Sequence, residues 1–123
     1  MKIAAQVLIA LVACLHLWFL TLEMFLWQKP LGLKTFRMSK ENAQTTAVLA
    51  ANQGLYNGFL AVGLLVSLFF SDPTQAFSFR VYFLGCVIVA GVYGAMTVSR
   101  RILYVQAFPA AAAMILTVLA SRG

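Results

Sequence analysis

Apolar residues are gathered into four long runs along this chain. The runs cover residues 3–27, 46–70, 79–98 and 102–120, and short polar segments separate them. Each run is close to the ~20 residues that a helix rising 1.5 Å per residue needs to cross ~30 Å of hydrocarbon. A backbone in lipid must satisfy its own hydrogen bonds, so the runs are predicted to be helices. The pattern therefore predicts an all-α membrane protein in which residues 1–123 form a single domain, a four-transmembrane-helix bundle.

The first run also resembles a lipoprotein signal, because Lys2 and an apolar stretch precede Leu11-Val12-Ala13-Cys14. A signal's apolar core is about 7–15 residues long and ends at the cleavage site. Here the apolar run continues past Cys14 to Trp27. We therefore expect an uncleaved membrane helix.

The polar segments carry turn and cap signals. Pro30 and Gly32 favour a turn after the first helix. Ser39, followed by Asn42, is suited to cap an early start of the second helix. Pro109 interrupts the fourth run and is expected to kink that helix.

Composition agrees with lipid as the solvent. Hydrophobic residues make up 63% of the chain and charged residues 10%, against about 45–50% and about 25% in soluble domains. The net charge is +6, but the basic residues lie between the apolar runs and do not form a nucleic-acid footprint. The expected partner is membrane lipid, and no nucleic acid is expected. Cys14 and Cys86 both lie in apolar runs and are interpreted as packing residues.

Lysine and arginine counts predict the orientation. The first and third connecting segments hold six basic residues: Lys29, Lys34, Arg37, Lys40, Arg100 and Arg101. The opposite side holds three: Lys2, Arg80 and Arg122. Positively charged loops stay in the cytoplasm. We expect a multi-pass protein of the bacterial inner (cell) membrane with both termini outside the cytoplasm.

Polar residues on all four predicted helices fall at similar depths. Counted from inner boundaries at residues 27, 46, 98 and 102, they lie four to eleven residues inside the membrane. The set is His16, Glu23, Asn52, Gln53, Tyr56, Asn57, Tyr93 and Gln106. Polar groups at such depths face a helix-bundle interior or water. The pattern predicts a polar cavity in the inner leaflet, lined by these eight residues.

Helical spacing favours convergence of this set. His16 and Glu23 are seven residues apart and so point to one side of their helix. At least one of His16 and Glu23 is expected to lie within hydrogen-bond reach of Asn52, Gln53 or Asn57. Small residues at positions 50, 54 and 58, and again at 91 and 94, predict close helix contacts within the chain or with a second copy or a larger membrane complex.

A metal or haem site is not expected. One histidine, one nearby carboxylate and no thiolate pair are too few ligands. We therefore predict neither a metal nor another cofactor.

Three segments resemble a known family: "HLWFLTLEMFLW", "NQGLYNGFLAVGLL" and "VAGVYGAMT". They are similar to the small bacterial membrane proteins catalogued as domain of unknown function 1304, and the similarity covers nearly the whole chain. The resemblance implies a four-helix integral membrane protein and implies no particular activity. The three segments contain seven of the eight candidate residues.

Three functions remain open at this point. The first is a membrane protein whose cavity binds a small amphipathic or lipid-like molecule. The second is an enzyme that uses Glu23 and His16, the two candidate catalytic residues, for proton transfer on a lipophilic substrate. The third is an accessory or structural subunit of a larger membrane complex. Bound small molecules would favour the first two, and a dry, fully paired polar network would favour the third.

Overall fold

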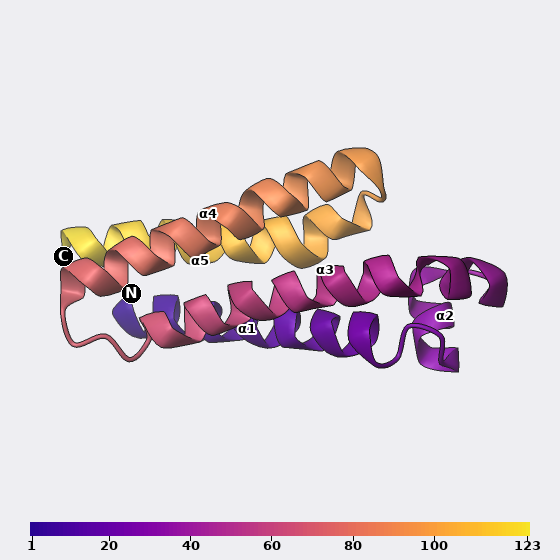
Figure 1. Cartoon of the computed structure of the whole chain (residues 1–123). Helices are drawn as coiled ribbons and strands as arrows, with labels where there is room; N and C mark the ends of the chain where they lie inside the picture. Colours follow the sequence, from indigo (N-terminus) through magenta and orange to yellow (C-terminus); the bar gives the residue numbers. More distant parts are fainter. The chain divides into compact units, whose positions relative to one another are not determined.

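The computed structural model describes residues 1–123, and the chain is helical with no strand (Figure 1). Four helical stretches are long and apolar enough to cross a membrane: Lys2–Met24, Lys40–Ser67, Pro73–Thr97 and Leu103–Arg122. The predicted fold class, an all-α membrane protein with four transmembrane helices, is confirmed.

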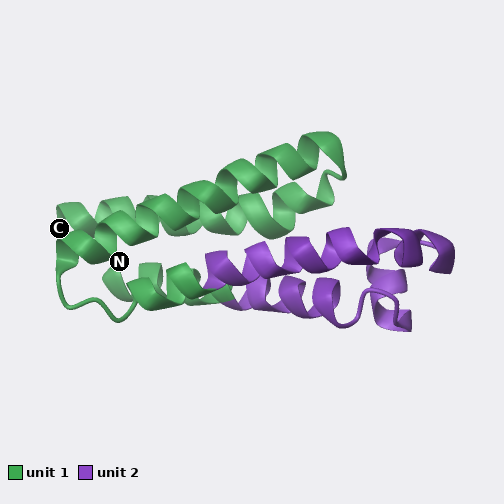
Figure 2. Ribbon diagram, in the orientation of Figure 1, with its two compact units in different colours: residues 1–13, 62–123 green, residues 14–61 purple.

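The chain divides into two compact units (Figure 2). Unit 1 comprises Met1–Ala13 and Val62–Gly123, and unit 2 comprises Cys14–Ala61. Helix α1 (Lys2–Met24) and helix α3 (Lys40–Ser67) each contribute residues to both units.

In unit 2, α3 begins six residues before the predicted residue 46, at Lys40. The cause is the predicted cap: the Ser39 hydroxyl oxygen accepts a hydrogen bond from the backbone N–H of Asn42 at 3.1 Å. This bond satisfies a donor that the first helical turn leaves unpaired. The polar first turns are therefore helical although their composition resembles a loop.

The link from α1 to α3 contains a short helix, α2 (Pro30–Phe36), where the sequence predicted a turn. Pro30 occupies the start of α2, where its fixed φ fits a helix and its missing N–H is not needed. Gly32 is buried, and its backbone lies against the Leu26 carbonyl, since a Cβ there would be 2.0 Å from the carbonyl oxygen. Arg37 ends α2 in the left-handed conformation, with φ 52°.

In unit 1, α4 (Pro73–Thr97) begins six residues before the predicted residue 79. Asp72 caps it, because its carboxylate accepts a hydrogen bond from the Thr74 N–H at 2.8 Å, and Pro73 occupies the first turn. Arg80, predicted at the membrane boundary, consequently lies seven residues inside a helix.

The last membrane stretch is built from a π-helical segment, η1 (Leu103–Ala107), followed by α5 (Phe108–Arg122). Pro109 lies in the first turn of α5. The wider turn precedes the proline, whose ring and missing N–H disfavour a regular α-helical turn at that point. Helices α4 and α5 lie side by side in opposite directions (Figure 1). Small residues pack between them, with Gly91 of α4 against Ala107 of η1.

Candidate functional site

Two glycines of α3 let α1 and α3 approach closely within unit 2. A methyl group at Gly54 would lie 2.7 Å from Met24 Cγ and 3.1 Å from Glu23 Cβ. A methyl group at Gly58 would lie 2.7 Å from Leu20 Cδ1. The predicted close contact at these two positions is therefore confirmed, and it brings the backbone of α3 next to the last turns of α1.

Asn57 lies on the same face of α3, between the two glycines. Its side-chain amide Nδ2 donates a hydrogen bond to Glu23 Oε1 at 2.5 Å. The Asn57 side chain is buried, with 5% of its surface exposed, whereas Glu23 is only half-buried. The prediction that one of these amides would reach His16 or Glu23 is thus confirmed, with Asn57 as the donor and Glu23 as the acceptor.

Glu23 also lines an open pocket at the end of α1, with a volume of about 340 Å³. The pocket continues through Met24, Phe25, Trp27, Gln28, Lys29 and, on α3, Ala47. One carboxylate, one ammonium group and one amide thus stand beside apolar walls. Such a lining offers both hydrogen-bonding groups and apolar surface to a small molecule.

The indole of Trp27 fixes the rim of this pocket. Its Nε1 donates a hydrogen bond to the Thr46 hydroxyl at 3.1 Å, and its ring packs against Phe36 of α2 with centroids 4.7 Å apart. An amphipathic tryptophan is suited to the boundary between hydrocarbon and headgroups. Trp27 therefore ties the end of α1 to both α2 and α3.

His16 lies two helical turns from Glu23 on α1 and is fully buried. Its imidazole meets the Phe19 ring edge-on, with centroids 5.3 Å apart. A residue with no exposed surface cannot meet a ligand unless the surroundings open. The geometry thus distinguishes His16 from the half-buried Glu23.

The other candidates differ in exposure. Asn52, Gln53 and Tyr56 have exposed side chains on α3, and the Tyr56 ring lies edge-on against Phe59. Tyr93 of α4 is 69% exposed, and Gln106 lies half-buried in η1. Tyr93 and Gln106 belong to unit 1, and the other six candidates to unit 2. Of the eight, Glu23 alone lines the pocket at the end of α1, and Asn57 bonds to it. A shared lining by all eight stays a prediction.

The sequence reasoning missed most of the pocket's lining. Gln28 and Lys29 were assigned to a connecting segment, and Phe25 and Ala47 to the ends of apolar runs, although all four line the pocket together with Glu23. The signal that could have found them is the position of Glu23 itself, in the last turn of α1. A carboxylate in the last turn of a helix lies next to the residues that follow that helix.

Comparison with known proteins places this architecture in a family. The chain is 32% identical over 108 residues to "Uncharacterized protein YpaA" from Lactococcus lactis subsp. lactis (strain IL1403), covering 86% of this chain and 89% of that protein. No solved structure matches it. The sequence model of the family described as "Protein of unknown function (DUF1304)" matches residues 10–118, which include Glu23 and Asn57. The chain belongs to this family.

Proposed function

We propose that the protein binds a small amphipathic or lipid-like molecule in the pocket beside Glu23, in a bacterial cell membrane. The observation that supports this proposal is that the Glu23 carboxylate accepts a hydrogen bond from Asn57 and also lines an open pocket. A carboxylate in a membrane helix is costly unless it has a partner or a role. The single hydrogen bond from the Asn57 amide leaves Glu23 able to accept others, because a carboxylate has about four lone-pair sites.

The lining suggests the chemistry of the ligand. The acceptor oxygens of Glu23 suit a hydroxyl or amine group, and the apolar side chains of Met24 and Phe25 suit a hydrocarbon portion. Lys29 and Gln28 add hydrogen-bond donors at the polar end. A molecule with one donor-bearing polar end and one apolar end fits this order.

Glu23→Gln tests the proposal, because it keeps the shape of the side chain and removes the charge. We expect the variant to fold like the wild type and to lose the small molecule that accompanies the purified wild-type protein. Native mass spectrometry with lipid extraction measures this. Glu41→Gln is the matched control, since Glu41 is an exposed carboxylate in the first turn of α3, and it should retain the molecule.

The proposal is wrong if the wild type carries no small molecule, or if Glu23→Gln and Glu41→Gln retain it equally. Capture of another membrane protein instead would favour the accessory-subunit function. Turnover of the retained molecule that Glu23→Gln abolishes would extend the proposal to catalysis.

A further inference from the structure

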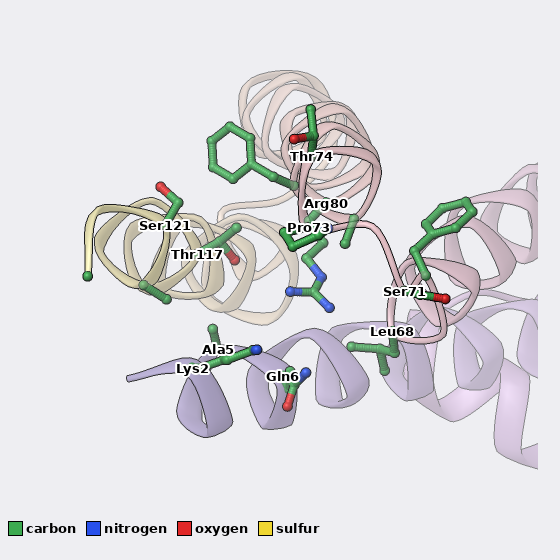
Figure 3. A pocket seen from close by; sticks show the side chains of 15 residues that line it. Lys2, Ala5, Gln6, Leu68, Ser71, Pro73, Thr74, Arg80, Thr117 and Ser121 are labelled. Atoms are coloured by element: carbon green, nitrogen blue, oxygen red, sulfur yellow. The ribbon is translucent and has the colours of Figure 1, made fainter.

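A second cavity lies entirely within unit 1. Two basic residues line it, Lys2 and Arg80, which the sequence analysis used only to predict the orientation in the membrane. The cavity has a volume of about 660 Å³. The first turns of α1, the segment that links α3 to α4, the start of α4 and the end of α5 surround it (Figure 3). None of its lining residues lines the pocket beside Glu23.

The guanidinium of Arg80 extends from α4 into this cavity (Figure 3). Its Nη2 donates a hydrogen bond to the backbone carbonyl of Ser67 at 3.1 Å. Its Nε is buried and has no hydrogen-bond partner. A guanidinium has five N–H donors, and leaving one of them buried and unpaired is unfavourable. The Ser67 carbonyl therefore engages one of the five donors, and the enclosed Nε–H has no partner, so the protein itself satisfies the guanidinium only in part.

The remaining polar lining favours an anion. Lys2 brings a second positive charge, Gln6, Ser71 and Thr74 bring neutral polar groups, and no acidic side chain lines the cavity. The nearest acid along the chain, Asp72, is engaged in capping α4 through its bond to the Thr74 N–H. Lys2 and Arg80 thus line a cavity that contains no acidic side chain, and Gly123, the last residue of the sequence, lines it as well.

The cavity also has apolar walls, formed in part by Leu68, Phe70 and Phe77. A small inorganic anion would leave these walls uncovered, whereas a lipid would cover them with its acyl chains. A guanidinium matches the oxygens of a phosphate with parallel N–H···O bonds. We propose that this cavity holds the phosphate group of a membrane lipid against Arg80 and Lys2.

The test uses the purified full chain and two probes with the same acyl chains, dioleoyl phosphatidylglycerol and dioleoylglycerol. Only the first carries a phosphate. Native mass spectrometry should show that the wild type binds dioleoyl phosphatidylglycerol more tightly than dioleoylglycerol. Arg80→Gln should weaken phospholipid binding about tenfold, the scale of losing one charge-assisted pair. Binding of dioleoylglycerol should not change.

Arg122→Gln is the matched control, because Arg122 is an exposed arginine at the end of α5 that does not line the cavity. It should retain wild-type affinity. Equal phospholipid affinity of the Arg80→Gln and Arg122→Gln variants would overturn the proposal. If Arg80→Gln does not fold, Lys2→Gln decides the question, since Lys2 is exposed and its loss should still weaken phospholipid binding severalfold. No effect of Lys2→Gln would then count against the site.

Competition with inorganic phosphate distinguishes a site for a lipid phosphate from a site for free phosphate. We expect millimolar phosphate to leave the bound phospholipid in place, because phosphate alone gains nothing from the apolar walls. Displacement that depends on Arg80 would show a phosphate site and overturn its assignment to a lipid.

Discussion

The contact between Gly91 of α4 and Ala107 of η1 gives a sharp test of how the C-terminal pair of helices is held. A methyl group at Gly91 would lie 2.8 Å from the backbone nitrogen of Ala107, 2.9 Å from its Cβ and 3.0 Å from its Cα. Gly85 lies in the same helix, and a methyl group there would meet nothing within 4 Å. The two Gly→Ala substitutions therefore add the same atom in opposite environments.

The expected magnitude follows from these distances. Carbon atoms are in favourable contact at about 3.5–4.0 Å, so α4 and η1 would have to separate by roughly half an ångström or more. Overpacking of this kind costs about 1–3 kcal/mol. Both substitutions also gain up to about 1 kcal/mol of helix propensity. Because that gain is common to both, Gly91→Ala should be less stable than Gly85→Ala by about 1–3 kcal/mol.

Equilibrium unfolding in detergent, followed by far-ultraviolet circular dichroism, measures the difference. Gly85→Ala should match or exceed the wild type in its free energy of unfolding, and Gly91→Ala should fall below Gly85→Ala. Equal unfolding midpoints for the two variants would refute the close packing of α4 on η1. A decrease for Gly85→Ala as large as that for Gly91→Ala would show instead that any methyl group on α4 is harmful.

Two further predictions concern α2 and the topology. Gly32→Ala should expel α2 from its position, because its methyl group would lie 2.0 Å and 2.7 Å from the backbone carbonyl oxygens of Leu26 and Trp27; trypsin should then cut faster after Lys34, and an unchanged rate would contradict the packing. Reporter fusions at the two termini should both give the signal of a non-cytoplasmic end, and a cytoplasmic signal from either would reverse the predicted orientation.

The sequence predicted the helices well because their signal is long and physically simple. About 20 apolar residues in a row have few alternatives to a membrane helix. The ends were harder to predict, because they depend on single residues. Ser39 and Asp72 each start a helix about six residues before the apolar run, and only the first of these caps was recognised from the sequence.

The candidate site was predicted in part for the same reason. Glycine spacing and polar residues at shared depth were sufficient to predict a close helix contact at Gly54 and Gly58 and an amide within reach of His16 or Glu23. They could not select Asn57 over Gln53, because both lie near that face and only the backbone approach decides which amide reaches the carboxylate. Counting depth also could not separate buried His16 from exposed Tyr56, since depth says nothing of where a side chain points around the helix.

The early start of α4 explains why the partial burial of Arg80 was not predicted from the sequence. If the third membrane helix started at residue 79, as predicted, Arg80 would lie in the headgroup region, where an arginine needs no special partner. Because Asp72 caps the helix, α4 starts at Pro73, and Arg80 lies seven residues inside it. A cation inside a helix wall needs a partner, and the Ser67 carbonyl provides only part of one.

Packing and ligand binding are not exclusive explanations of the Glu23–Asn57 pair. The two glycines flank Asn57 on α3, and their missing side chains bring the amide within reach of Glu23. A pair that served packing alone is expected to have every polar group satisfied within the protein, because a partly satisfied buried network is costly. Here the amide is buried and the carboxylate is half-buried and borders an open pocket of about 340 Å³. Asn57 therefore fixes the position of a carboxylate that retains acceptor capacity beside an open pocket, which is the asymmetry that the proposed binding function requires.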